Sequence, residues 1–164
     1  MTGSRYEATR PTSWPRSRLG CPSSKAGNSA FGFLFGYISG RNQSQTSVAM
    51  TAPVIQATAQ EGCYSVAFVL PTSMTARTAP EPTNPRVTIR RVPPSLGAAT
   101  RYSGRWPQTS FESHCTGLLA GIEVEGFTVV GTPRFARFDP PYKPWFLRRN
   151  EVIVDVLQDS GTPH

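Results

Sequence analysis

The sequence predicts an α+β domain in which one β-α-β-β repeat is used twice, and three observations support this class. Apolar side chains recur at helical spacing in two places, residues 30–39 and 109–122. Each of these helices is followed by two segments of alternating or β-branched residues, which favour strands. A loop rich in proline and threonine, residues 71–85, separates the two sets. One repeat alone leaves a face uncovered, so we expect two main helices packed against a sheet.

Residues 1–27 differ from the rest of the chain. They hold five basic residues against Glu7 alone, with three prolines and five serines. No apolar period of 2 or 3.6 runs through them, so we expect an irregular, disordered or altered segment. The first strand of the first repeat is therefore missing or unrecognisable. An Arg- and Ser-rich start is also typical of organelle transit peptides. The predicted domain is 28–158, with a flexible tail at 159–164.

The first half is predicted to hold one helix and two strands. Asn28 is a suitable N-cap, and Phe31, Leu34, Phe35 and Ile38 then fall on one helical face that we expect to be core. Gly40 and Asn42 supply the signals that end the helix. Strands are expected at about 48–58 and 63–70. Pro53 places the first of them at a sheet edge, a bulge or a strand start.

The second half is predicted to open with a strand at 87–91 and a further extended piece that ends near 102–104. A capping box, Thr109 with Glu112, then begins the second helix. Strands near 127–138 and 151–157 complete the domain. The core stripe expected on the helix consists of Phe111, Cys115, Leu118, Leu119 and Ile122.

Composition narrows the classes of function. The net charge is +7, but the arginines are scattered and no nucleic-acid motif accompanies them, so a basic groove for a small acidic ligand fits better than nucleic-acid binding. The longest apolar run, residues 31–38, is far shorter than the about 20 residues of a membrane span. Three cysteines without paired spacing favour a reducing compartment, and we expect the cytoplasm.

The first helix carries an unusual pattern. Phe33 and Tyr37 lie roughly opposite its expected core face, and Gly32, Gly36 and Gly40 form a side stripe. An interior glycine costs a helix about 1 kcal/mol relative to alanine, so the stripe needs a reason. Two interpretations stay open. The glycines allow tight packing of the helix on the sheet, or the second aromatic face lines a pocket.

Eight blocks of the sequence are distinctive in their order, and they are residues 28–42, 48–54, 68–71, 80–82, 87–94, 101–104, 137–142 and 145–152. Together they resemble the SOUL haem-binding protein family over about residues 28–157. It implies a distorted β-barrel or sheet of two pseudo-symmetric β-α-β-β repeats. It also implies non-covalent binding of haem or a related tetrapyrrole in a shallow apolar cleft beside the first helix. The start of the chain departs from the family pattern at residues 6–14.

A haem site needs apolar walls and cations for the propionates. We therefore expect Phe33, Tyr37 and Met50 to form walls and Arg41 to pair with a propionate. Other roles are open for two of them, because Arg41 also suits the negative end of the helix dipole and Met50 suits packing.

Candidates for an iron ligand are few, and the resemblance implies none. His114 is a weak candidate, with a half-exposed surface histidine as the alternative. Cys63 and Cys115 are potential thiolates, but buried cysteines are usually inert. His164 lies in the tail. Binding should therefore rest mainly on apolar contact.

No catalytic motif is present in the sequence, and the block 148–151 is interpreted as a turn into the last strand. We expect a protein that carries or buffers haem and is not an enzyme. The alternatives are an enzyme that removes iron from haem or opens its ring, and an effector-binding module for amphipathic small molecules.

Overall fold

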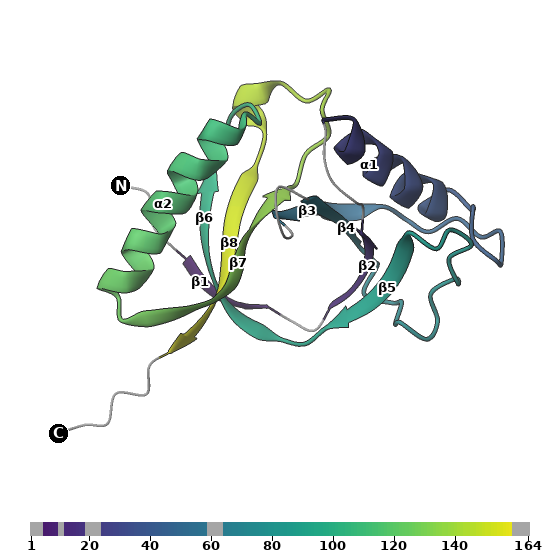
Figure 1. Ribbon diagram of the computed structural model, residues 1–164, viewed down its shortest axis with the longest axis horizontal. Helices are drawn as coiled ribbons and strands as arrows, with labels where there is room; N and C mark the ends of the chain where they lie inside the picture. The colour runs from purple at the N-terminus through teal and green to yellow at the C-terminus, as the bar shows by residue number, and fades with distance from the viewer. Residues whose placement is uncertain (1–4, 10–11, 19–23, 59–63, 159–164) are drawn as a thin grey trace. The chain divides into compact units, whose positions relative to one another are not determined.

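A computed structural model describes residues 5–9, 12–18, 24–58 and 64–158 (Figure 1). These residues form two compact units, here called the α1 unit, within residues 11–93, and the α2 unit, residues 5–9 with 94–158. The elements in chain order are β1 (Arg5–Thr9), β2 (Thr12–Arg18), α1 (Ser24–Ile38), β3 (Thr51–Thr58), β4 (Tyr64–Val69), β5 (Val87–Val92), β6 (Ser95–Tyr102), α2 (Gln108–Val124), β7 (Phe127–Arg137), the 3-10 helix η1 (Trp145–Leu147) and β8 (Asn150–Gln158).

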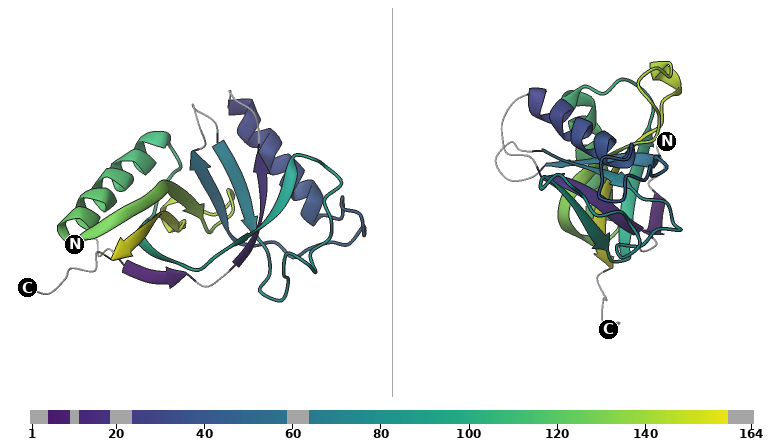
Figure 2. Two further views of the ribbon diagram at one scale, coloured as in Figure 1. Left: turned by 60° about the horizontal axis from the view of Figure 1, so that its bottom comes forward. Right: turned by 90° about the vertical axis from the view of Figure 1, so that its right-hand side faces the viewer.

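Each unit is an open antiparallel sheet covered by one helix. In the α1 unit the strand order is β3-β4-β2-β5, and α1 packs against β2, β4 and β5. In the α2 unit the order is β1-β6-β8-β7, and α2 packs against β6, β7 and β8. Figure 2 shows each helix lying along the sheet of its own unit. The predicted α+β class with two helices is confirmed, and neither sheet is closed into a barrel.

The repeat is confirmed and is one strand longer than the predicted β-α-β-β pattern. Both halves of the chain have the order β-β-α-β-β. The first strand of each half pairs with the second strand of the other half, since β1 pairs with β6 and β5 pairs with β2. Each sheet is thus completed by a strand from the other half of the sequence.

Two strands lie where the sequence predicted an irregular segment. β1 and β2 occupy residues 5–9 and 12–18, and α1 begins at Ser24, before the expected Asn28. The first strand of the first repeat is therefore present. Strand pairing uses backbone N–H and C=O groups, and β2 pairs with β4 on one side and β5 on the other. Tertiary pairing can override a weak side-chain pattern of this kind.

The face of α1 that enters the core differs from the predicted one. Leu34 and Ile38 are buried as expected, together with Tyr37, but Phe31 and Phe35 are exposed. The two exposed rings stack on one another with their centroids 6.2 Å apart. A helix with aromatic residues on two sides has no single apolar stripe, so spacing alone did not fix its rotation.

The second helix has the predicted core stripe but a different start. Leu118 and Ile122 are buried, and the other three predicted positions pack partly buried around them. The N-cap is Pro107, with no side-chain cap, so the predicted capping box is wrong. Glu112 instead accepts a hydrogen bond from the Gln108 side chain at 3.1 Å.

Pro53 lies at an irregularity of the sheet, as predicted, because the β3–β4 register shifts between Thr51 and Val54. Among the described residues, no helix is both long and apolar enough to cross a membrane.

Candidate functional site

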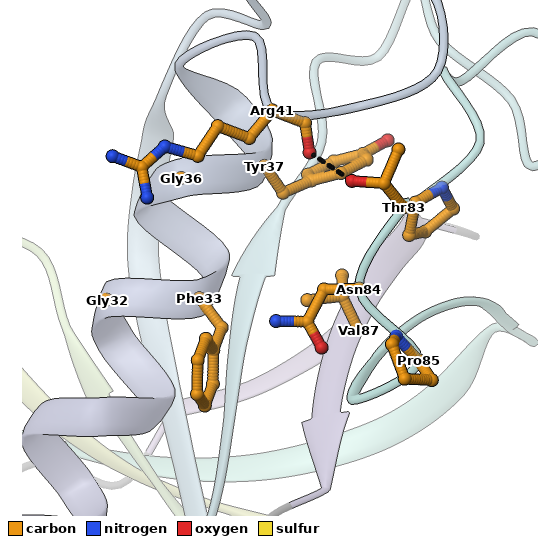
Figure 3. Close-up of a pocket in the computed structure, with 10 residues that line it drawn as sticks. Gly32, Phe33, Gly36, Tyr37, Arg41, Thr83, Asn84, Pro85 and Val87 are labelled. Atoms are coloured by element: carbon orange, nitrogen blue, oxygen red, sulfur yellow. Dashed lines mark hydrogen bonds between the residues drawn. The ribbon is translucent and has the colours of Figure 1, made fainter.

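The α1 unit contains a pocket of about 430 Å³ between α1 and the segment that leads into β5 (Figure 3). Its volume lies within the range of about 300–1,000 Å³ that is usual for small-molecule sites. The residues that line it are Gly32, Phe33, Gly36, Tyr37, Arg41, Pro82, Thr83, Asn84, Pro85 and Val87.

The helical wall of the pocket is formed by two glycines and two aromatic residues. Gly32 is exposed, and a Cβ atom there would meet nothing within 4 Å. A Cβ atom on Gly36 would lie 3.2 Å from the Cδ of Arg41, whose side chain runs back over this glycine (Figure 3). Of the two interpretations of the glycine stripe, the pocket fits better, because Gly32 and Gly36 both line it and a Cβ on Gly32 would enter open space.

Tyr37 is fixed as a wall of the pocket. Its hydroxyl donates a hydrogen bond to the Pro80 carbonyl oxygen at 2.8 Å, and the side chain is buried. Burial raises the pKa of Tyr37, so the neutral phenol is favoured. A phenol that keeps its proton for a carbonyl group is a poor ligand for iron, and its contribution to the pocket is the ring.

The opposite wall, residues 82–85, is tied to the end of α1. Asn42 forms an isolated bridge with Pro82, and Thr83 Oγ1 donates to the Arg41 carbonyl oxygen at 3.1 Å. Asn84 Oδ1 accepts from the Arg86 backbone N–H at 3.0 Å, which closes the turn into β5. Both walls are thus held at a set separation.

Buried Asn42 organises the turn that follows α1. Its side-chain Nδ2 donates to the carbonyl oxygens of Tyr37 and Thr46, at 3.0 and 2.7 Å. Its Oδ1 accepts from the Thr46 N–H at 3.1 Å. Gly40 has φ +99° here, a conformation that favours glycine and ends the helix. The backbone of Arg41 is held at the rim of the pocket by this network.

The charges around the pocket are positive. Arg41 lines it and is exposed, and the guanidinium carbon of Arg86 lies 5.4 Å from the centre of the Phe33 ring. None of the ten lining residues carries a carboxylate. Aromatic walls with guanidinium groups at the rim suit a ligand that is apolar in its body and anionic at its edge.

The structure brings together three of the four predicted site residues. Phe33, Tyr37 and Arg41 line one pocket, whereas Met50 is not among the lining residues and has 51 % of its surface exposed. Met50 precedes β3, and nothing in the structure assigns it to this site.

The predicted iron-ligand candidates lie elsewhere or outside the described residues. His114 belongs to α2, where its ring stacks on Tyr102 with centroids 4.0 Å apart. Cys115 is a free, partly buried thiol whose pKa is raised by burial, which favours the protonated form. Cys63 and His164 are outside the described residues. No group of three or more His, Cys, Asp or Glu side chains that could hold a metal ion occurs in the described ranges.

Sequence reasoning missed the second wall of the pocket. The sequence predicts that residues 71–85 only separate the two repeats, yet residues 82–85 line the site. The signal was the block 80–82 in the family resemblance. Its place beside α1 depends on hydrogen bonds across about forty residues, which no local pattern records.

A family model identifies the family of this chain, and similar solved structures show its fold. A family model described as SOUL heme-binding protein matches residues 5–155. No curated protein sequence matches the chain.

Similar solved structures include the EcmrR C-terminal domain, with a TM-score of 0.73 and 10 % identity over 96 % of this chain and 99 % of that one. A hydrolase from Listeria innocua has a TM-score of 0.63 and 10 % identity, covering 94 % and 91 %. SAV2435 bound to tetraphenylphosphonium has a TM-score of 0.54 and 9 % identity, covering 94 % of both chains. At such identities the likeness shows the fold alone.

Proposed function

Since this chain belongs to the SOUL family of heme-binding proteins, we propose that the pocket between α1 and residues 82–85 holds the tetrapyrrole. We further propose that the protein carries or buffers haem without altering it. The observation that carries the proposal is a pocket lined by two aromatic residues and Arg41 without a lining carboxylate, with the guanidinium of Arg86 next to the lining residue Phe33.

The apolar body of a porphyrin matches the walls. Phe33 is partly buried against the core, so its ring is held in place by packing. Tyr37 is anchored through its hydroxyl, and Pro85 and Val87 supply aliphatic surface on the other side. Rigid aromatic and aliphatic walls bind a flat ring by removing apolar surface from water, at about 25 cal/mol for each Å².

The propionate groups match the cations. Arg41 stands at one end of the pocket and Arg86 beside Phe33, and charge-assisted hydrogen bonds to carboxylates are about twice as strong as neutral ones. The carboxylate-free lining leaves no repulsion against an anionic ligand. A cationic ligand would meet the opposite arrangement.

No lining residue is a histidine, cysteine or methionine, so this proposal assigns no side-chain ligand to iron. Affinity should then come from the ring and the propionates, with non-covalent binding. The test is a titration with haemin and with metal-free protoporphyrin IX, followed by absorbance and fluorescence quenching.

The expected result is a pair of dissociation constants within a few-fold of each other, with His114→Ala leaving both within the same range. Much tighter binding of haemin than of the metal-free ring would contradict a ligand-free site. Absence of binding to either compound by folded protein would remove the proposed function.

Spectra also separate a carrier from an enzyme acting on haem. A stable Soret band in the presence of a reductant supports the carrier. Time-dependent bleaching, or release of iron, would instead favour the enzyme.

An effector-binding module for amphipathic cations is the remaining candidate, favoured by the fold that the chain shares with the tetraphenylphosphonium-bound structure. The positive rim of this pocket opposes it. In a thermal-shift comparison, haemin should stabilise the protein and tetraphenylphosphonium should not. The reverse order would support the effector module.

We also propose the cytoplasm as the location, on the basis of the three cysteines without paired spacing. Cell fractionation with a compartment marker would test this, and recovery in an organelle would support a targeting role for the Arg- and Ser-rich start.

A further inference from the structure

The loop between β7 and β8, residues 138–149, exposes a cluster of large apolar side chains in the α2 unit. The exposed fractions are 88 % for Tyr142, 48 % for Trp145, 58 % for Phe146 and 57 % for Leu147. Trp145 and Phe146 touch edge to face, with ring centroids 5.6 Å apart. Contiguous exposed apolar surface of this kind usually marks an interaction site.

This loop is held in shape by its own hydrogen bonds. Asp139 Oδ2 accepts from the Arg149 backbone N–H at 2.6 Å, and its Oδ1 pairs with Lys143 Nζ at 2.6 Å. These two bonds keep the pKa of Asp139 below its usual range. The carboxylate therefore stays ionised at neutral pH and closes the base of the loop.

Arg148 supports the loop from inside. Its guanidinium donates to the carbonyl oxygens of Lys143, at 2.7 Å, and of Pro141. It also lies 4.5 Å from the centre of the Trp106 ring. Because the backbone is fixed in this way, the exposure of η1 (Trp145–Leu147) is a property of the folded loop.

The loop and its neighbour Arg105 carry positive charge that no carboxylate of the described residues pairs with. Lys143 and Arg149 are paired with Asp139 and Glu151. Within the part of the chain that the structure describes, Arg148 bonds only carbonyl groups and Arg105 bonds no carboxylate. The guanidinium of Arg105 lies 5.7 Å from the centre of the Trp145 ring, beside the apolar cluster.

We infer that loop 138–149 docks the protein on an anionic lipid surface. Tryptophan and other amphipathic rings are favoured at the headgroup level of a membrane. Each arginine near the surface adds about 1 kcal/mol to the free energy of binding when the lipids are anionic. Trp145, Phe146 and Leu147 enter the interface, while exposed Arg105 faces lipid phosphates and the internally bonded Arg148 adds positive charge behind it. Charge complementarity selects an anionic surface. The loop lies above β8 in Figure 1.

The test is co-sedimentation of the full chain with vesicles of phosphatidylcholine alone and of phosphatidylcholine mixed with phosphatidylserine. The protein should sediment with the mixed vesicles and release at high salt, because surface charge is screened. The double variant Phe146→Ser, Leu147→Ser should bind at least about tenfold more weakly, given the apolar area lost.

Leu157→Ser is the matched control, because Leu157 is 61 % exposed on β8 of the same unit but outside the loop. It should bind vesicles as the unchanged chain does. Circular dichroism verifies that both variants are folded. Brominated lipid should quench tryptophan fluorescence in the unchanged chain and less in Trp145→Phe.

Three results would overturn the inference. They are no sedimentation with mixed vesicles, equal sedimentation with both vesicle types, and unchanged binding by the folded double variant. A self-association that disappears in the double variant, without vesicle binding, would assign the cluster to a second copy of the chain instead.

Discussion

Two buried tyrosine hydroxyls illustrate how single residues contribute to this protein. Tyr37 donates its proton to the Pro80 carbonyl oxygen, whereas the Tyr102 hydroxyl is buried and makes no hydrogen bond of ordinary geometry among the described residues. Burial raises the pKa of Tyr102 to about 12, although nearby Arg137 and the Ser110 hydroxyl oppose the shift. The Tyr37 hydroxyl fixes a wall of the pocket, and the Tyr102 hydroxyl makes the free energy of unfolding depend on pH.

The Tyr102→Phe variant should lose that pH dependence. A raised pKa means that the folded state holds the phenol proton more tightly than the unfolded state. The contribution of Tyr102 to the free energy of unfolding is therefore complete below pH 10 and is lost as the pH rises towards 12. Linkage puts the loss at about 2 to 3 kcal/mol. Urea unfolding at pH 7 and at alkaline pH should show a loss that is larger in the unchanged chain than in the variant by about this amount, because Tyr37 and Cys115 also have raised pKa values in both proteins. At pH 7 the variant should be equally or slightly more stable. An equal alkaline loss in both would contradict the assignment.

Arg41 tests the charged side of the pocket. Arg41→Ala should weaken haemin binding by about tenfold, the value of a charge-assisted hydrogen bond of roughly 1.5 kcal/mol. Arg77→Ala is the control, because Arg77 is exposed in the same unit and does not line the pocket. Absorbance titrations give both constants. Equal affinities would show that no propionate meets Arg41.

At the scale of elements, α1 shows where sequence patterns stop being sufficient. The helix itself, its end at Gly40 and its pocket-side glycines could be predicted from local chemistry. Its rotation could not, because aromatic residues surround it and both rotations bury apolar area. Packing against β2, β4 and β5 decided between them.

A matched pair of substitutions on α1 checks that rotation. Leu34 is completely buried, so Leu34→Ala should lower the free energy of unfolding by about 2 to 5 kcal/mol. Phe35→Ala should change it by about 0.5 kcal/mol or less, because Phe35 is exposed. Urea unfolding measures both. A larger loss for Phe35→Ala would mean that the helix presents the originally predicted face to the core.

At the scale of the whole molecule, the repeat explains both the success and the failure of sequence reasoning. Helical spacing and alternating strands were enough to identify two copies of one pattern. Strand β5 could be predicted at residues 87–91, but its pairing with β2, and the pairing of β1 with β6, could not, since each of these pairs joins the two repeats. β1 and β2 are strands because their backbones pair with β6 and β5, about eighty residues further along the chain. The composition at the start of the chain does not predict such pairing.

The sequence predicts one wall of the pocket and not the other. Three lining residues on α1 and its following turn were found because a helix places them at fixed spacing. The opposite wall, residues 82–85, was missed because only the folded chain brings it beside α1. Met50 is the predicted wall residue that lies outside the pocket lining, because residue type alone does not tell which part of the folded chain a methionine contacts.

A haemin titration of two glycine variants tests most directly whether the pocket beside α1 holds the tetrapyrrole. Gly32→Leu projects a side chain into the proposed pocket. Gly117→Leu adds the same side chain at an exposed glycine of α2, outside the pocket. Neither added Cβ meets an atom within 4 Å. Both replace a helical glycine, so both gain similar helix propensity. Because the added side chain fills the pocket, Gly32→Leu should bind haemin at least about tenfold more weakly, and Gly117→Leu should bind it unchanged. Unchanged haemin affinity in a folded Gly32→Leu protein would contradict it.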